Sequence, residues 1–284
     1  MTSREALILT RQTLASANSN EAGIESELLL CHALGISKTK LYSEPQRVLT
    51  PTEIKELQHS INRCLLHEPI VYILEHCDFY GHDFYVNHRA FIPRPETELL
   101  VEEAIDFAHH HTISQNELIL ADIGTGSGAI AISVAVALPQ AKVYAVDITA
   151  STLHVAHINC QRYHVTHQVT LLQGDLLEPL PEPVNVIIAN LPYVKNHELR
   201  MLPPEIMNFE PSVALIGGED GLNVIRQLLN QTQEKICPGG CLLLEIGYGQ
   251  KEPIISLING HFPQASIEII PDLAGIERIA RIIL

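Results

Sequence analysis

From residue 118 onward, short apolar runs alternate with longer segments of helical periodicity, and this alternation limits the fold more than any other feature. Strands are expected at 118–122, 142–147, 169–173, 184–190 and 241–246, helices at 129–138, 150–163 and 222–236, and a terminal strand pair near 265–270 and 278–284. Such alternation predicts an α/β fold, in which helices cover both faces of a parallel sheet. Ligands of such sheets bind at the carboxyl ends of the strands.

The first 66 residues show helical periodicity without an intervening strand. Thr50, Pro51 and Glu53 match the N-cap, the first helical position and the capping-box glutamate of one of these helices. From 70 to 86, aromatic and β-branched residues surround a turn signal, which predicts a β-hairpin or an extended connector. We therefore expect a small all-helical domain over 1–75, a β-hairpin linker over 76–90 and an α/β domain over 91–284.

The composition, with 46% hydrophobic and 18% charged residues, is typical of a globular protein. No apolar stretch is long enough to span a bilayer and no signal peptide is evident, so we expect a cytoplasmic location and no membrane partner. The 15 histidines offer no zinc ligand set, and no metal site is expected.

The formal net charge of −15 is unevenly distributed. Residues 1–75 hold 7 basic and 9 acidic residues, out of totals of 18 and 33. The remainder of the chain is therefore strongly acidic. Enzymes that act on nucleic acid normally carry basic surface, so this charge balance argues against a DNA or RNA substrate.

A glycine-rich turn, Gly124-Thr125-Gly126-Ser127-Gly128, follows the first strand of the α/β region. Glycine lacks a Cβ and accepts positive φ, so the backbone can approach a ligand closely. Asp147 ends the next strand, where a carboxylate can accept hydrogen bonds from ribose hydroxyls. The same glycine spacing also fits a nicotinamide dinucleotide, so the turn alone leaves the cofactor open.

The third strand ends in Gly174-Asp175-Leu176. Asp175 can accept a hydrogen bond from an adenine amino group while Leu176 packs on the ring. The alternative for Asp175 is a turn cap. Asp122 and Asp147 occupy corresponding positions at the ends of the two preceding strands. This correspondence favours the ligand role for Asp175.

The fourth strand ends in Asn190-Leu191-Pro192-Tyr193, and this ending separates the cofactor hypotheses. The lone pair of an amide or exocyclic amine nitrogen is delocalised, so such a nitrogen is a poor nucleophile. The Asn190 side-chain oxygen and a neighbouring main-chain carbonyl can accept its two N–H bonds, which aims the lone pair at a methyl donor. Pro192 restricts Leu191 to extended conformations, and Tyr193 can pack against the planar group. The tetrapeptide thus predicts methyl transfer to a planar nitrogen.

The chain resembles the HemK/PrmC family, the S-adenosylmethionine-dependent enzymes that methylate a glutamine side chain in peptide chain release factors. The resemblance covers nearly the whole chain. It rests on Glu68-Pro69-Ile70, Phe79-Tyr80-Gly81, Phe91-Ile92-Pro93-Arg94-Pro95-Glu96-Thr97-Glu98, the turn at 122–131, Glu210-Pro211, Gly217-Gly218-Glu219-Asp220-Gly221-Leu222 and Leu244-Glu245-Ile246-Gly247.

The resemblance implies a Rossmann-like class I methyltransferase sheet, preceded by a helical domain that docks the substrate. It implies that S-adenosylmethionine contacts 124–128, Asp147, Leu176 and Asn190, to which the reasoning above adds Asp175. Residues 190–193 are implied to hold the glutamine amide of the Gly-Gly-Gln motif of class 1 release factors. The implied reaction is methylation of the amide nitrogen (N5), with Asn190, Pro192 and Tyr193 as catalytic positions.

One residue departs from the family pattern, which usually reads Asn-Pro-Pro-Tyr where this chain has Leu191. Asn-Leu-Pro-Tyr is similar to the form in ribosomal RNA adenine dimethyltransferases. An adenine amino-group methyltransferase acting on ribosomal RNA or DNA is therefore the alternative, and a non-catalytic release-factor-binding module is a second one. Position 191 acts through its main-chain carbonyl, so leucine is compatible with the glutamine substrate that the other matches favour.

Overall fold

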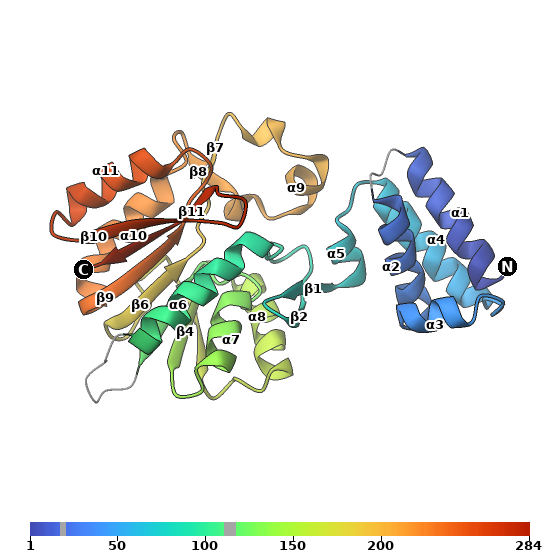
Figure 1. Cartoon of the computed structure of the whole chain (residues 1–284), viewed down its shortest axis with the longest axis horizontal. Helices are drawn as coiled ribbons and strands as arrows, with labels where there is room; N and C mark the ends of the chain where they lie inside the picture. The colour runs from blue at the N-terminus through green and yellow to red at the C-terminus, as the bar shows by residue number, and fades with distance from the viewer. Residues whose placement is uncertain (18–20, 111–117) are drawn as a thin grey trace. The chain divides into compact units, whose positions relative to one another are not determined.

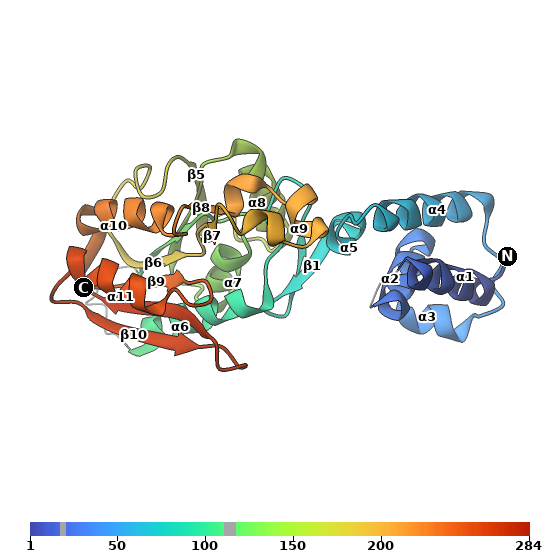
Figure 2. The ribbon, with the colours of Figure 1, turned by 90° about the horizontal axis from the view of Figure 1, so that it is seen from above.

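The structure is a computed structural model that describes residues 1–17, 21–110 and 118–284, and these residues form two units. The first unit joins Met1–His76 with Pro203–Phe209, and the second joins Cys77–Leu202 with Glu210–Leu284. The first is helical and the second contains the large sheet (Figures 1 and 2). Among the described residues, no helix combines the length and the apolar character needed to cross a lipid bilayer.

The helical unit is stabilised by local capping and by a leucine-rich core. Its helices are α1 (Ser3–Ser16), α2 (Ala22–Leu34), α3 (Lys38–Ser43), α4 (Pro51–Leu65), α5 (Ile70–Leu74) and α9 (Pro204–Phe209). The predicted capping box is confirmed, because Thr50 Oγ1 accepts from Glu53 N while Glu53 Oε2 accepts from Thr50 N. Leu29, Leu30 and Leu57 are buried in the core between these helices.

The prediction of an extended segment from residue 70 is wrong for its first part, because 70–74 form the helix α5. Tyr72, Ile73 and Leu74 are buried, and this burial outweighs the strand preference of aromatic and β-branched residues. Glu75 ends the helix in the left-handed conformation, with a φ of 59°. Tertiary packing therefore decides the structure of a segment whose composition favours a strand.

A β-hairpin, β1 (His76–Phe79) and β2 (His82–Tyr85), follows directly. Its two turn residues, Tyr80 and Gly81, both have positive φ, at 50° and 71°. Positive φ at both central residues is the type I′ geometry that suits the twist of a two-residue hairpin. Phe79 and Phe84 are buried in the core of the second unit, which anchors the hairpin to it.

The second unit is built on a seven-stranded sheet with the order β10-β11-β9-β6-β3-β4-β5. The strands are β3 (Ile119–Ile123), β4 (Lys142–Asp147), β5 (Val169–Gln173), β6 (Val184–Ala189), β9 (Ile236–Glu245), β10 (Ser266–Pro271) and β11 (Glu277–Ile283). All pairs from β9 to β5 are parallel, whereas β11 is antiparallel to both neighbours. The chain winds outward from β3 to β5 and then returns to β6, so the strand order reverses between β3 and β6.

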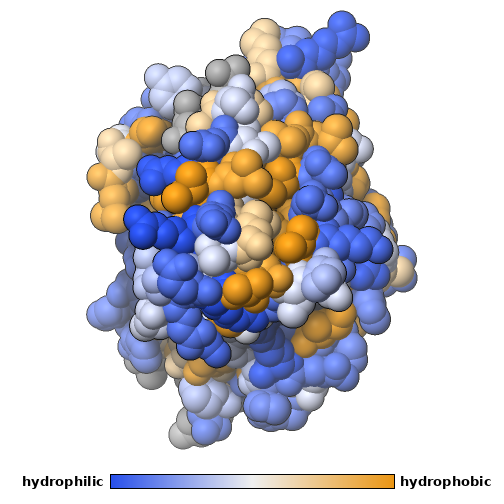
Figure 3. Space-filling view, turned by 90° about the vertical axis from the view of Figure 1, so that its right-hand side faces the viewer, coloured by the Kyte–Doolittle hydropathy of each residue, from blue (hydrophilic) through white to orange (hydrophobic). Residues whose placement is uncertain are grey.

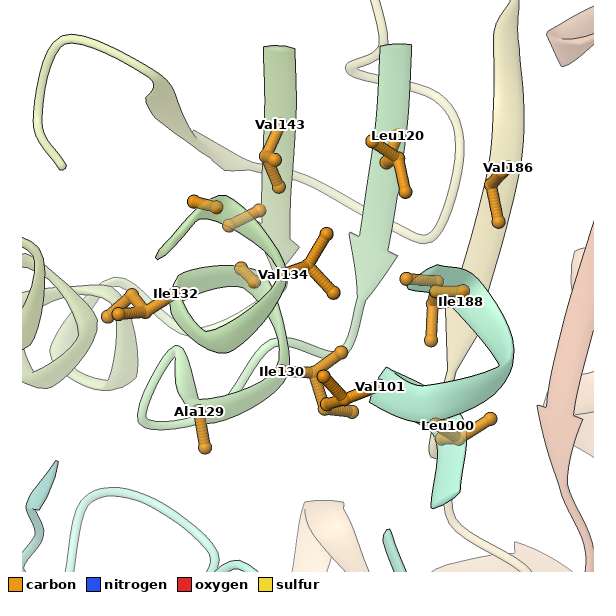
Figure 4. Close-up of a cluster of buried hydrophobic side chains, with 14 of the residues drawn as sticks. Leu100, Val101, Leu120, Ala129, Ile130, Ile132, Val134, Val143, Val186 and Ile188 are labelled. Atoms are coloured by element: carbon orange, nitrogen blue, oxygen red, sulfur yellow. The ribbon is translucent and has the colours of Figure 1, made fainter. Parts of the chain in front are cut away.

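Helices cover both faces of the sheet, as predicted. On one face lie α6 (Glu98–His110), α7 (Ala129–Ala137) and α8 (Ala150–Arg162), and on the other α10 (Asn223–Lys235) and α11 (Lys251–His261). Successive residues of β4 alternate between the two cores, with Val143 in the first and Tyr144 in the second. Figure 4 shows Leu120 and Val143 on the face that α7 covers with Val134.

Several elements were not predicted or begin elsewhere. The strand expected at 241–246 begins five residues earlier as β9, because Pro238-Gly239-Gly240 hides the pattern and the pairing with β6 changes register between Val184 and Val186. The helices α3, α9 and α11 had no prediction of their own. Neither had the short elements β7 (Val194–Lys195), β8 (Ile216–Gly218) and the 3-10 helices η1 (Pro95–Thr97), η2 (Leu199–Met201) and η3 (Ser212–Ala214).

Candidate active site

The glycine turn and the Asn190–Tyr193 loop meet where the strand order of the sheet reverses. They follow β3 and β6, which are parallel neighbours paired as far as Ile123 and Ala189. A Cβ built on Gly124 would lie 3.4 Å from Leu191 Cδ2 and 3.6 Å from the main-chain oxygen of Asn190. The two segments that the sequence analysis selected independently therefore line the same site.

Three glycines give the turn its shape. Gly124, Gly126 and Gly128 have φ values of 75°, 59° and 82°, which side chains other than glycine rarely adopt. The main-chain N–H groups of Gly124 and Thr125 both donate to the carbonyl of Val146 on β4, at 2.9 Å. This pins the start of the turn to the neighbouring strand.

Asp122, just before the turn, is a fully buried carboxylate in the segment 122–131 that carries part of the family resemblance. Its Oδ2 accepts hydrogen bonds from Thr125 Oγ1 (2.6 Å) and Ala131 N (3.1 Å), which ties β3 to the turn and to α7. Its Oδ1 is buried and has no partner among the described residues. Burial raises the pKa of Asp122 to about 7, although both hydrogen bonds oppose this rise.

Asp147, at the end of β4, lies against the glycine turn. Its Oδ2 accepts from Gly126 N (3.1 Å) and its Oδ1 from Thr149 N (2.9 Å). Burial raises the pKa of Asp147, and these two hydrogen bonds partly offset the rise. Each oxygen keeps a further lone pair for another donor.

Asp175 and Leu176 lie beside Asp147, because Gly174 N donates to the main-chain oxygen of Asp147 at 3.2 Å. The side chain of Asp175 is exposed, whereas Leu176 is buried. Leu176 has a φ of 51°, in the left-handed region that is unfavourable for a branched side chain. The turn after β5 therefore places an exposed carboxylate and a buried apolar side chain beside the end of β4, the strand to which the glycine turn is hydrogen-bonded.

A chain of hydrogen bonds through Thr97 and Glu245 holds the Asn190–Tyr193 loop. Asn190 Nδ2 donates to Thr97 Oγ1 (3.1 Å), and Thr97 Oγ1 donates to Glu245 Oε2 (2.6 Å). The hydroxyl of Tyr193 donates to the other oxygen, Glu245 Oε1, at 3.3 Å. Thr97 and Glu245 were not predicted as functional residues, although both lie in segments that carry the family resemblance.

Glu245 is buried, and burial raises its pKa. The hydrogen bond from Thr97 and the positive charge of Arg278 oppose that rise, whereas the Glu96 carboxylate adds to it. Burial and the adjacent Glu245 carboxylate also raise the pKa of Tyr193, so this phenol remains protonated at neutral pH.

Two glycines allow a second segment to approach the loop. A Cβ on Gly217 would lie 2.7 Å from both Pro192 O and Tyr193 Cα, closer than packed atoms allow. A Cβ on Gly221 would lie 2.3 Å from Tyr193 O. Buried Gln250 joins these elements, because its Nε2 donates to the carbonyls of Tyr193 and Gly221, both at 3.4 Å.

The segment that carries Thr97 is itself fixed by a buried carboxylate. Glu210 pairs with Arg94 and accepts a hydrogen bond from the main-chain nitrogen of Ile92 at 3.4 Å. Glu210, like Thr97, belongs to a segment that the resemblance includes and was not assigned a role. Within residues 1–17, 21–110 and 118–284, no three His, Cys, Asp or Glu side chains come together to hold a metal ion.

Two family models match parts of this chain. The family model of the PrmC N-terminal domain matches residues 5–74, and that of ribosomal protein L11 methyltransferase (PrmA) matches residues 103–212. The release factor glutamine methyltransferase of Koribacter versatilis is 35% identical over 282 residues, which are 98% of this chain and 97% of that protein.

The chain belongs to the release factor glutamine methyltransferase family. The family member from Geobacter sulfurreducens is 37% identical over 91% of this chain and 88% of its own length. The family resemblance, the enzyme class and the class I methyltransferase fold predicted from the sequence are thereby confirmed.

Among solved structures, the hMettl16 catalytic domain in complex with MAT2A 3′UTR hairpin 6 has a TM-score of 0.58 and covers 80% of this chain and 81% of that one. A human methyltransferase 10 domain containing protein has a TM-score of 0.50 and covers 72% and 90%. Their sequence identities of 13% and 14% mean that these likenesses concern the fold alone.

Proposed function

We propose that this chain transfers a methyl group from S-adenosylmethionine to the side-chain amide nitrogen (N5) of the glutamine in the Gly-Gly-Gln motif of class 1 peptide chain release factors. Its relatives over nearly the whole chain are named release factor glutamine methyltransferase. The observation that carries the proposal is the hydrogen bond from Asn190 Nδ2 to Thr97. This hydrogen bond engages the nitrogen of the Asn190 amide. It leaves Oδ1 free to accept a hydrogen bond from an N–H of the nitrogen that is to be methylated, beside the glycine turn.

The residues that bind the methyl donor, S-adenosylmethionine, are proposed to be Gly124, Thr125, Gly126, Ser127, Gly128, Asp147, Asp175, Leu176 and Asn190. S-adenosylmethionine, when bound, supplies a methyl group activated by its sulfonium charge. The turn fits such a ligand because its glycines lack a Cβ and adopt positive φ values, so the main chain leaves room for close approach. Asp147 has a lone pair on each oxygen for ribose hydroxyls, and Asp175 offers an open carboxylate to an amino group.

The residues that hold the methyl acceptor, the glutamine amide, are proposed to be Asn190, Leu191, Pro192 and Tyr193. The Oδ1 of Asn190 and the main-chain carbonyl of Leu191 would accept hydrogen bonds from the two N–H groups of the glutamine amide, orient its nitrogen and stabilise the positive charge that develops on it. As the N–CH3 bond forms, the S–CH3 bond breaks and S-adenosylhomocysteine leaves. The methylated nitrogen then loses one proton to solvent, without a general base. Pro192 keeps Leu191 extended. Tyr193, whose hydroxyl is held by Glu245, would pack its ring against the planar amide.

The small all-helical domain, expected over residues 1–75, is proposed to dock the release factor. It exposes several large hydrophobic side chains, among them Ile8, Leu9, Ile24 and Leu28. Figure 3 shows hydrophobic side chains gathered among hydrophilic ones on one face of the molecule. Exposed apolar surface of this kind suits a protein partner. A release factor as substrate also places the reaction in the cytoplasm, where translation terminates.

An adenine amino group in ribosomal RNA or DNA is the second candidate acceptor, and Leu191 is the observation in its favour. In the structure the Leu191 side chain is buried in the core beside Gly124, so leucine contributes packing at this position. The net charge of −15 opposes a polyanionic substrate. A non-catalytic release-factor-binding module is opposed by the intact glycine turn and Asn190.

The deciding experiment is mass spectrometry of purified class 1 release factor after incubation with this protein and S-adenosylmethionine. We expect one added methyl group on the Gly-Gly-Gln glutamine. The Asn190→Ala variant should abolish turnover while it retains part of the donor affinity, and Asn196→Ala, an exposed asparagine, serves as the matched control. Methylation of ribosomal RNA, with none on the release factor, would select the second candidate. Near-normal turnover by Asn190→Ala would contradict the proposed role of the amide.

A further inference from the structure

We propose that Thr97 and Glu245 fix the orientation of the Asn190 side-chain amide, so that Oδ1 and not Nδ2 faces the acceptor nitrogen. The inference rests on the proposed function, because the orientation matters only if the acceptor donates N–H groups. Neither residue is assigned contact with substrate or donor. Both are positioning residues that act through Asn190.

The direction of the hydrogen bonds carries the inference. A threonine hydroxyl has one hydrogen, and an ionised carboxylate has none. Thr97 must therefore donate to Glu245 Oε2, at 2.6 Å, and can only accept from Asn190, at 3.1 Å. Only Nδ2 of Asn190 can donate. A flipped amide would place Oδ1 against Thr97 Oγ1 with no hydrogen between the two oxygens.

Burial makes this arrangement hard to replace with water. Thr97 and Glu245 are 4% and 2% exposed. They come from η1 and from the end of β9, whereas Asn190 follows β6. Because β6 and β9 are paired in register as far as Ala189 and Leu244, Asn190 and Glu245 leave the sheet side by side. The pairing of β6 with β9 therefore sets the distance between Asn190 and Glu245, which the Thr97 hydroxyl bridges.

Glu245 also links the two ends of the acceptor loop. Its second oxygen accepts the hydroxyl of Tyr193 at 3.3 Å, so one carboxylate holds Asn190 through Thr97 and Tyr193 directly. Burial raises the pKa of Glu245, whereas the hydrogen bonds from Thr97 and Tyr193 and the guanidinium of Arg278 oppose that rise. These three contacts favour the ionised form, on which the direction of the Thr97 hydrogen bond depends. The amide oxygen and the aromatic ring of the loop are thus oriented by the same buried group.

The test compares Thr97→Val, which keeps the shape but removes the hydroxyl, with Thr97→Ser, which keeps the hydroxyl. Thr232→Val is the matched control, because Thr232 is also buried but donates only to the Leu228 carbonyl within α10. The measurements are kcat and KM with purified release factor, the Kd of S-adenosylmethionine by calorimetry, and Tm. Thr97→Ala serves as the second variant if the valine variant does not fold.

We expect kcat of Thr97→Val and Thr97→Ala to fall about tenfold or more, the effect of one hydrogen bond to a charged group. The Kd of S-adenosylmethionine should change less than about twofold, since Asn190 is only one of the nine residues proposed to bind the donor. Thr97→Ser should restore most of kcat, and Thr232→Val should leave it unchanged. A wild-type kcat in Thr97→Val overturns the inference. So does a serine variant as slow as the valine variant, or an equal loss of donor affinity. A wild-type protein that does not methylate release factor would instead refute the proposed function.

Discussion

Asn159 and Ser127 are joined by a buried hydrogen bond that connects the helix α8 to the glycine turn. Asn159 Nδ2 donates to the Ser127 carbonyl at 2.8 Å and to the Tyr85 carbonyl at 2.9 Å, while its Oδ1 accepts from Tyr85 N at 2.8 Å. The side chain is fully buried. One amide therefore holds the hairpin strand β2 and the proposed donor-binding turn together.

Replacing Asn159 with alanine should weaken both the fold and the donor site. It removes the partner of one buried main-chain group, the Ser127 carbonyl, and of two part-buried ones on Tyr85, at a cost of roughly 2–4 kcal/mol in the free energy of unfolding. The freed Ser127 carbonyl should also raise the Kd of S-adenosylmethionine. Urea unfolding and calorimetry check the two effects. Gln161→Ala, an exposed residue of the same helix, is the control. Unchanged donor affinity would show that the turn keeps its shape without this contact.

The Asp147→Ala variant should bind S-adenosylmethionine more weakly by about 1–3 kcal/mol, because it loses the carboxylate proposed to receive the ribose hydroxyls. Titration calorimetry measures the change directly. Asp106→Ala removes an exposed carboxylate of α6 and should leave donor affinity intact. If Asp147→Ala bound the donor as well as wild type, the ribose role would be refuted.

Asp122 makes the stability of the protein depend on pH. Its folded pKa of about 7 lies above its ordinary value of 3.8, so between these values unfolding releases a proton. The free energy of unfolding therefore falls as pH rises through this window, by up to roughly 1.4 kcal/mol per pH unit from this group. Asp122→Asn keeps an oxygen for Thr125 and Ala131 but removes the titration. Its stability relative to wild type should increase from about pH 5 to about pH 7 in urea unfolding. A constant difference would show that Asp122 is ionised throughout.

Gly217→Ala should lower kcat, because its Cβ would collide with the main chain of Pro192 and Tyr193 at 2.7 Å and displace the acceptor loop. The loop cannot yield by rotating a side chain, so we also expect a loss of about 1–3 kcal/mol in unfolding free energy. Gly260→Ala, in α11, is the matched control. Its Cβ meets no atom within 4 Å, and alanine should stabilise this helix by up to about 1 kcal/mol. Equal effects of the two substitutions would argue against the close approach.

The sequence predicted the elements that are specified locally. The strands β4 and β5 have the predicted bounds, since each is a short apolar run between turn residues. The helix α4 begins at Pro51 because its cap, proline and glutamate act within four residues. In contrast, α11 was missed, because Pro253 and Gly260 obscure its pattern. Proline is tolerated there because it lies in the first turn, where its missing N–H has no helical partner.

The residues of the candidate site likewise fall into those that local sequence patterns predicted and those that they did not. The glycine turn, Asp147 and Asn190 were found because each follows a strand at the same edge of the sheet. The contacts of Thr97 with Asn190 and Glu245 span 93 and 148 residues, and no local pattern relates such positions. Gln250 likewise reaches Tyr193 across 57 residues. The residues proposed to bind ligands are thus visible in the sequence, whereas the residues that orient them are defined by tertiary packing.

The place of β11 in the sheet affects how the protein is made. β11 follows β10 in the chain but lies between β10 and β9, with Ile279 opposite Glu245. Until Glu277–Ile283 has left the ribosome, β9 is an open edge, and β10 has no partner through which to join the sheet. Glu245 stands at the end of that open edge. A nascent chain that lacks β11 would therefore leave the edge of β9 open to other strands, and the strand that carries Glu245 gains its second neighbour only when β11 has been made.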